Sequence, residues 1–426
     1  MTRELAEAGP RTLEERLFGP GKKRILTLDG GGVRGIVSIA FLAEMERQLR
    51  DATGNPHLVL ADVFDLIAGT SVGSMLATML ALGKPMSEVE AGFRELAPKI
   101  FTGRETMFGR RRFSAKPLIN GVRSLLGGLS DVTLGSSHLV TGLCIIAKRV
   151  DTGSVWALTN NSRMPYYHDG PDWDGNKHYK LEMLVRASAA APFLFTPTEI
   201  TIHTDRFGKE HKGLFVDGAV TPHNNPALQV LTMAALPAYK LGWTLSPDDL
   251  LLVSIGTGMH RTVIDRSRKA LRGVFASVIS STRREDIEEA YFAAQTLGGQ
   301  IADAGVFNLK VLQSLSNPRF SWRINGEINA LEGELLLRAV KGLSEHLDER
   351  GIIRFQRYDL PLEKGRLVPP EYDVEASADE LRALHAIDEP LNIDRLYALA
   401  SEAARKQVSL QDFAGFVEMP VAAPMS

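Results

Sequence analysis

The sequence predicts an α/β fold, in which short apolar strands alternate with helices. The first observation is an apolar strand at residues 23–29 that ends in a run of glycines and is followed by a helical pattern at 36–49. The second is a strand at 63–68, a glycine-flanked turn at 69–73 and a helix-like segment at 74–80. Two strand–turn–helix units in succession are typical of a parallel sheet that is covered by helices.

The turn of the second unit carries a serine at its apex. Gly69 and Gly73 flank Ser71 in a G-x-S-x-G pattern. A side chain at either glycine would crowd the turn, and glycine relaxes into its strained backbone. A plain βα turn could use the same glycines, but the strand before and the helix after favour a nucleophile. We expect the serine hydroxyl to point out of the top of the sheet, beside a helix N-terminus.

The first strand ends in a glycine-rich loop. Gly30, Gly31, Gly32 and Gly35 leave a row of unobstructed backbone N–H groups at a strand-to-helix junction. Such a nest of N–H groups binds an anion. The anion is either a phosphate or the oxyanion that forms in acyl transfer.

The same loop fits the G-x-G-x-x-G pattern of dinucleotide-binding proteins. That pattern needs an acidic residue at the end of the next strand to hold the ribose. The nearest candidate, Asp51, lies at the end of the helix instead, and the next strand ends in Gly69. The sequence has no G-K-[ST], which excludes a P-loop. These observations favour the oxyanion.

A nucleophilic serine needs a base. Asp217 is the candidate that the sequence favours, because a short apolar strand at 213–217 delivers it and Gly218 then turns the chain. A carboxylate within hydrogen-bond reach can take the serine proton directly. A histidine base held by an acid is the alternative, with His223 and His260 as its candidates.

The three motifs, taken in this order, resemble the signature of the patatin-like phospholipase family. That signature comprises a D-G-G-G-x-R-G loop, a G-x-S-x-G elbow and a D-G-[AG] aspartate, which stand here at residues 29–35, 69–73 and 217–219. Two further stretches, 186–193 and 254–258, resemble weaker markers of the same family.

The resemblance implies a three-layer α/β/α fold with a central, mostly parallel sheet. It implies a serine lipid acyl hydrolase, a carboxylic ester hydrolase whose Ser-Asp dyad works with no histidine, metal or cofactor. Ser71 would be the nucleophile and Asp217 its base, and a fatty acyl group would pass from a phospholipid to Ser71 and then to water. The resemblance places the oxyanion hole at Gly30, Gly31, Gly32, Val33 and Arg34, with Gly35, Gly69, Gly73 and Gly218 as supporting residues of the motifs.

We expect the chain to have three parts. These are an N-terminal helical or flexible segment at 1–21, a catalytic core at 22–280, and a mostly helical C-terminal extension at 281–426 that packs on the core. Within the extension, the pattern predicts helices at 285–302 and 393–407 and a strand at 353–358. The extension could regulate the enzyme or form a homo-oligomer. Some bacterial members of the family are antiviral effectors that a cyclic nucleotide activates, so the resemblance suggests such an activator here.

Composition is typical of a cytoplasmic enzyme. The chain has 426 residues and a net charge of −2, so there is no general bias toward nucleic acid polymers. The single cysteine, Cys144, excludes an internal disulfide and is expected to be a buried, inert thiol. No apolar stretch reaches about 18 residues, so we expect no transmembrane helix. The charged N-terminus lacks the pattern of a signal peptide.

Two surface segments have open interpretations. Residues 166–179 are rich in Asp and His but match neither EF-hand nor zinc spacing, so we expect a polar loop. Residues 101–113 interleave arginines with phenylalanines. This segment could lie on anionic lipid headgroups in a peripheral membrane contact, or it could bury its phenylalanines in the core.

Two alternatives to the dyad hydrolase stay open. One is a nucleotide-sensing or scaffolding protein on the same fold with an inactive site. The other is a Ser-His-Asp esterase that uses His223 or His260. Ser71→Ala separates the first alternative from the hydrolase, because only the hydrolase would lose its function. Replacement of the histidines separates the second.

Overall fold

The computed structural model describes residues 11–102, 104–107, 110–114, 116–125, 131–192, 194–260, 284–316, 321–324, 328–332, 351–363 and 376–418. In this part of the chain, eight strands form one sheet in the order β12-β9-β1-β2-β5-β8-β7, with β6 paired to β5. The pairs from β12 to β5 are parallel, and the pairs that involve β6, β7 and β8 are antiparallel. The predicted α/β fold with a mostly parallel sheet is confirmed.

The strands of the sheet are β1 (Lys23–Leu28), β2 (Leu66–Thr70), β5 (Gly142–Arg149), β6 (Ser154–Thr159), β7 (Thr198–Thr204), β8 (Glu210–Asp217), β9 (Leu250–Ile255) and β12 (Arg354–Tyr358). Two separate hairpins are β3 (Arg104–Met107) with β4 (Arg110–Phe113), and β10 (Ser321–Ile324) with β11 (Ile328–Glu332). The helices are α1 (Leu13–Phe18), α2 (Gly35–Thr53), α3 (Leu60–Val63), α4 (Val72–Ala81), α5 (Met86–Ile100), α6 (Lys116–Leu125), α7 (Leu181–Ser188), α8 (Ala227–Ala235), α10 (Arg284–Ser316), α12 (Ala378–Ala383) and α13 (Ile393–Gln407).

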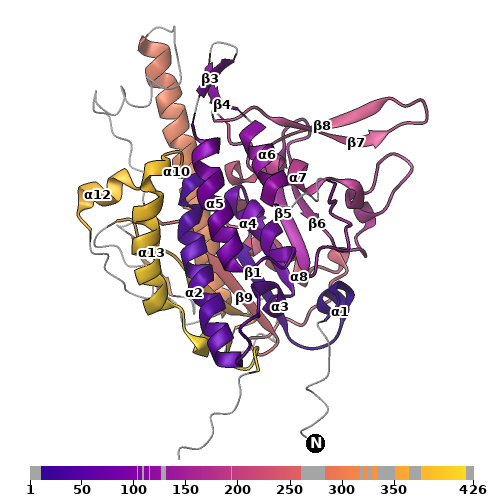
Figure 1. Cartoon of the computed structure of the whole chain (residues 1–426), viewed down its shortest axis with the longest axis vertical. Helices are drawn as coiled ribbons and strands as arrows, with labels where there is room; N and C mark the ends of the chain where they lie inside the picture. The colour runs from indigo at the N-terminus through magenta and orange to yellow at the C-terminus, as the bar shows by residue number, and fades with distance from the viewer. Residues whose placement is uncertain are drawn as a thin grey trace, which may run out of the picture.

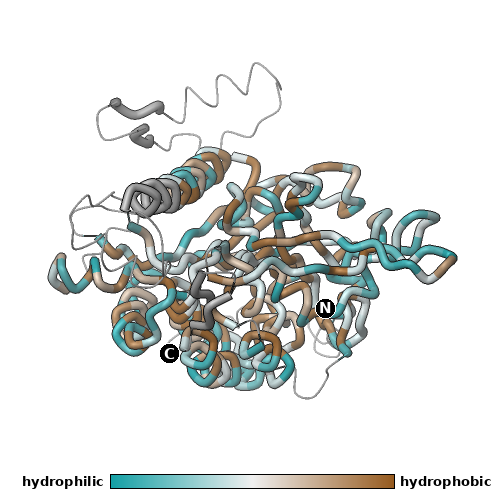
Figure 2. The backbone as a smooth tube through the Cα atoms, turned by 90° about the horizontal axis from the view of Figure 1, so that it is seen from above, coloured by the Kyte–Doolittle hydropathy of each residue, from teal (hydrophilic) through white to brown (hydrophobic). Residues whose placement is uncertain are grey.

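Helices cover both faces of the sheet, and the apolar residues of one strand divide between them. Leu26 and Leu28 of β1 belong to the core cluster that includes α2, α4, α5 and α13. Ile25 of the same strand belongs to a second cluster with α1, α8 and α10. Strands buried on both faces read as continuous apolar runs rather than alternating ones. Figure 1 shows the sheet behind α2 and α4, and Figure 2 shows it edge-on between α10 and the opposite helices.

The C-terminal part of the chain contributes a helix and a strand to the α/β fold. α13 lies along α2 and buries Leu396, Leu399 and Ala403, and Figure 1 shows the two helices side by side. β12 pairs in parallel with β9 and forms one end of the sheet. The helix predicted at 393–407 and the strand predicted at 353–358 are both confirmed.

α10 is longer than the pattern predicts. The expected helix at 285–302 continues to Ser316, because Leu309 and Leu312 add further buried contacts to the core cluster on that face of the sheet. The first ten residues of the predicted N-terminal segment lie outside the described residues, and the boundaries of the three predicted parts stay a prediction.

Two smaller expectations concern single positions. Cys144 is fully buried in β5, and burial raises the pKa of its thiol to about 12, which makes it unreactive. In the polar loop at 166–179, Asp169 accepts hydrogen bonds from the Gly175 N–H and from His178, so the loop closes on itself. No helix of the described residues is long and apolar enough to cross a bilayer.

Candidate active site

The pairing of β2 and β8 with β5 brings the predicted nucleophile and base together. Thr70, the last residue of β2, pairs with Ile146 of β5, and Asp217, the last residue of β8, pairs with the next residue, Ala147. β2 and β8 therefore approach each other end to end along one edge of β5. Ser71 follows directly, and its Oγ lies 2.7 Å from Oδ2 of Asp217.

Ser71 occupies a strained turn between β2 and α4. Its backbone has φ 56° and ψ −125°, a conformation that side-chain-bearing residues rarely adopt. A Cβ at Gly69 would overlap the carbonyl of Gly73, and a Cβ at Gly73 would overlap the carbonyl of Leu28. Both glycines are therefore needed for the turn to close against β1.

A second serine holds this turn from the side. The Ser71 N–H donates to Oγ of Ser188 at 2.9 Å, and the Ser188 hydroxyl donates to the carbonyl of Ile146 at 2.6 Å. Two residues further on, the carbonyl of Ala190 accepts the N–H of Asp217 at 3.0 Å. The end of α7 and the residues just after it thus fix the backbone of both Ser71 and Asp217.

Asp217 is 2% exposed, and its surroundings favour a proton acceptor that works near neutral pH. Burial raises its pKa to about 7, while hydrogen bonds from the Ala219 N–H and the Ser71 hydroxyl act in the opposite direction. The Ala219 N–H lies 2.8 Å from Oδ1, so the carboxylate is oriented with Oδ2 toward the serine. General bases are most effective when their pKa lies close to the working pH.

Three of the five N–H groups expected in the oxyanion hole are already bonded. Gly30 donates to the carbonyl of Asn224 at 3.1 Å, Val33 to that of Ile387 at 2.8 Å, and Arg34 to that of Gly31 at 3.1 Å. Within the described residues, no hydrogen bond engages the N–H groups of Gly31 and Gly32. These two donors are the ones left for an incoming oxyanion.

Arg34, His260 and His385 line one cavity together with Ser71 and Asp217. The Arg34 side chain is largely buried and donates through Nη1 to Nδ1 of His260 at 3.0 Å, while its Nε has no partner among the described residues. The rings of His260 and His385 stack with centroids 3.8 Å apart. Burial lowers the pKa of His260 to about 3, and the Arg34 charge adds to that effect.

The histidines considered as alternative bases are not hydrogen-bonded to Ser71 in the described part of the chain. The hydrogen bonds described for Ser71 Oγ and the Asp217 carboxylate involve neither His223 nor His260. His223 uses its backbone carbonyl to accept the Thr70 hydroxyl, and burial lowers the pKa of its ring.

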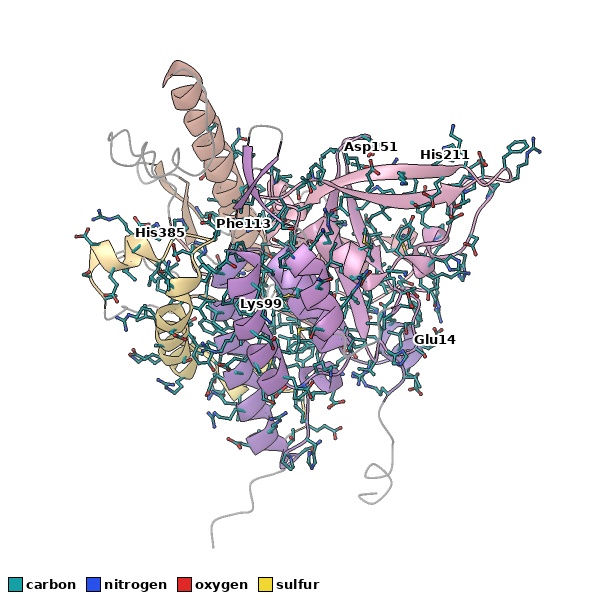
Figure 3. All side chains as sticks on the ribbon, turned by 45° about the horizontal axis from the view of Figure 1, so that its top comes forward. Glu14, Lys99, Phe113, Asp151, His211 and His385 are labelled. Carbon is teal, nitrogen blue, oxygen red and sulfur yellow. The ribbon has the colours of Figure 1, made fainter. Side chains whose placement is uncertain are left out.

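Ser71 and Asp217 open into a cavity of about 1280 Å³. Much of its wall is apolar and comes from α4, α5 and α10, through Val72, Met75, Phe93, Leu96, Leu297 and Ile301. Three phenylalanines, Phe101, Phe113 and Phe195, form a ring cluster in the same wall with centroids 5.4–6.2 Å apart. Phe113 and His385, labelled in Figure 3, thus bring distant parts of the chain to one cavity.

The position of Phe113 bears on the open interpretation of residues 101–113. Phe101 and Phe113 line the cavity and Phe113 is buried, as expected if the segment buries its phenylalanines. The arginine side chains of this segment lie outside the described residues.

Sequence reasoning missed several residues that shape the site. Ser188 stood in a stretch that resembles a family marker, but its hydroxyl had no assigned role. Asn224 and Ile387 contribute backbone carbonyls, for which residue type carries no signal.

Comparisons with known proteins agree with the motifs. A sequence model of the family described as Patatin-like phospholipase matches residues 26–231. Patatin-2-Kuras 1 of Solanum tuberosum is 29% identical over 254 residues, which cover 55% of this chain and 62% of the relative. The cGAMP-activated phospholipase of Escherichia coli (strain TW11681) is 30% identical over 238 residues, with 55% and 62% covered. The chain thus matches about three fifths of the length of these relatives.

Among solved structures, human GIVD cytosolic phospholipase A2 aligns with 95% of this chain and 61% of its own, at 11% identity and a TM-score of 0.41. The family assignment comes from the sequence match and from the three motifs that the fold brings to one cavity. Residues 26–231, which carry all three motifs, therefore match the patatin-like phospholipase family.

Proposed function

We propose that this protein is a serine lipid acyl hydrolase that cleaves fatty acyl esters of membrane phospholipids. The observation that carries the proposal is the 2.7 Å contact between Ser71 Oγ and Asp217 Oδ2 at the base of a largely apolar cavity. A hydroxyl and a carboxylate at this distance form an activated nucleophile.

In the proposed reaction, Ser71 Oγ attacks the acyl carbonyl carbon while its proton passes to Oδ2 of Asp217. The carbonyl oxygen becomes an oxyanion and accepts hydrogen bonds from the Gly31 and Gly32 N–H groups. The tetrahedral intermediate collapses, the ester C–O bond breaks, and Asp217 returns the proton to the leaving alcohol. Water then attacks the acyl-enzyme with Asp217 again as base, and the fatty acid leaves as Ser71 regains its proton.

The lining of the cavity supports a lipid substrate. The cluster of Phe101, Phe113 and Phe195 offers an apolar wall for an acyl chain. Arg34 supplies a positive charge in the same cavity and has an Nε without a partner among the described residues. An arginine in this state suits a phosphate group, so we assign it to the lipid phosphate.

The test is fatty acid release from mixed phospholipid liposomes by the wild type and four variants. We expect Ser71→Ala and Asp217→Ala each to lose about 10³-fold or more in kcat. His223→Ala and His260→Ala serve as matched controls and should retain turnover. Loss of turnover in either histidine variant, with Asp217→Ala still active, would favour the Ser-His-Asp esterase.

The same assay addresses the scaffolding alternative. A wild type that releases no fatty acid, while Ser71→Ala leaves ligand binding and assembly unchanged, would support a non-catalytic protein. The proposed action at a membrane surface in the cytoplasm, and a homo-oligomeric state, are measured by liposome co-sedimentation, cell fractionation and light scattering.

Activation by a cyclic nucleotide is a separate part of the proposal. Its support is the relative from Escherichia coli that is named a cGAMP-activated phospholipase. We expect fatty acid release to rise when cGAMP is added, which would link the chain to antiviral signalling. Equal release with and without cyclic nucleotides would contradict this part and leave the hydrolase proposal intact.

A further inference from the structure

Arg357 of β12 holds the residue from which the glycine loop starts. Its Nη1 and Nη2 donate to Oδ1 and Oδ2 of Asp29 at 3.1 and 2.7 Å, which is a two-pronged ion pair. The Arg357 side chain is 5% exposed and that of Asp29 is 9% exposed. A planar guanidinium fixes the orientation of a carboxylate in this geometry, which a lysine cannot reproduce.

The guanidinium is itself held on its other side. Nη1 also donates to Ser254 Oγ at 2.7 Å, and Nη2 to Oδ2 of Asp359 at 2.7 Å. Oδ1 of Asp359 accepts the N–H of Gly258 at 2.8 Å, and the hydroxyl of Thr257 donates to the carbonyl of Gly30 at 2.8 Å. The segment after β9 and the glycine loop are therefore bound to one buried network.

The charges of this buried network balance one another. Asp29 and Asp359 both form an ion pair with Arg357. The negative charge of Asp359 also favours the charged form of the nearby Arg34. Two carboxylates and two guanidiniums make a buried group with no net charge. Removal of one partner from such a group is costly, because the others stay buried without compensation.

We infer that Arg357 is a positioning residue of the active site, which acts through Asp29 to hold the Gly31 and Gly32 N–H groups toward the reacting carbonyl. This inference rests on the proposed function. β12 lies outside residues 26–231, so a strand beyond the family match completes the oxyanion hole. The functional unit thus includes residues far into the C-terminal part of the chain.

The test compares Arg357→Lys and Arg357→Met with Arg24→Met in the full chain. Arg24 makes a similar ion pair with the buried Asp65, but at the opposite ends of β1 and β2, away from the glycine loop. Active sites are counted with a fluorophosphonate that labels the serine, and kcat is expressed per labelled site well below each unfolding temperature. This separates the geometry of the site from the fraction of folded protein.

We expect both Arg357 variants to lose about 10²-fold in kcat per site, the size of losing one oxyanion donor, with KM changed less than about threefold. Arg24→Met should keep the wild-type kcat per site even if it unfolds earlier. Asp29→Asn should lose a similar factor, and the double variant with Arg357→Met should lose no more than either single change.

Two substrates keep the outcomes distinct. Phospholipid liposomes test the proposed function, and a short p-nitrophenyl ester tests the oxyanion hole without a lipid requirement. Wild-type activity on the short ester but not on phospholipid would contradict the proposed substrate alone. Wild-type kcat per site in Arg357→Met on the short ester, or losses that multiply in the double variant, would overturn the role of Arg357.

Discussion

At the scale of single residues, the ionisation of Asp217 sets the pH range in which the site can work. Its pKa is raised to about 7 by burial, and the proposed base must be deprotonated to take the serine proton. We therefore predict that kcat/KM on a short ester falls about tenfold per pH unit below pH 7 and levels off above it. An acid limb centred near pH 4, typical of an exposed aspartate, would contradict this assignment.

The same residue should reduce the stability of the fold. Its folded-state pKa lies above the unfolded value of 3.8, so the wild type loses stability as the pH rises from about 4 to about 7. Asp217→Asn carries no charge and escapes this loss. We predict that urea unfolding shows the variant more stable by about 4 kcal/mol above pH 7, with the difference vanishing near pH 4. A variant less stable than the wild type at pH 8 would contradict the raised pKa.

The sequence indicated Ser71 and Asp217 as candidates because each stands next to a glycine turn that ends a strand. The sequence did not indicate a role for Arg357, because nothing near that arginine in the sequence points to a partner more than 300 positions away. Of the five donors that it assigned to the glycine loop, three are already bonded to carbonyls. Which N–H groups are already bonded depends on carbonyls from Asn224 and Ile387, and those contacts arise only from the packed fold.

At the scale of elements, the elbow between β2 and α4 depends on close packing against β1. A Cβ at Gly73 would overlap the Leu28 carbonyl. We predict that Gly73→Ala lowers the free energy of unfolding by about 3 kcal/mol and removes activity.

Gly299 of α10 is the matched control, because among the described residues no atom beyond its own stretch of helix lies within 4 Å of a Cβ placed there. Gly299→Ala should leave activity unchanged and raise stability by up to about 1 kcal/mol, since alanine favours a helix. Thermal unfolding of both variants checks the pair. Equal stability of Gly73→Ala and wild type would show that the turn can open without loss.

The elements themselves were largely predictable. Apolar runs bounded by glycines indicated β1, β2 and β8, and helical spacing indicated α2 and α13. The full length of α10 was not predictable, since its last turns gain their stability from contacts with the sheet, through Leu309 and Leu312. The order of the strands in the sheet could not be predicted from the pattern either, because the paired strands β9 and β12 lie about a hundred residues apart in the chain.

At the scale of the whole molecule, the C-terminal part behaves as a component of the α/β unit. α13 packs along α2 and β12 ends the sheet beside β9. We predict that a chain ended at residue 280, the expected limit of the core, yields no cooperatively folded protein. Removal would expose the buried faces of α2 and β9 to water. A soluble truncated chain with a cooperative thermal transition would contradict this and support a separable extension.

Ser71, activated by Asp217, is the nucleophile that we propose for this cavity. The most direct measurement is the reaction of the full chain with a lipid-like fluorophosphonate, followed by peptide mass spectrometry and by the rate of labelling in Asp217→Asn. We predict a single adduct on Ser71 and a labelling rate that is lower in the variant by at least about 10²-fold. An adduct on another residue, or equal labelling rates in the two proteins, would contradict it.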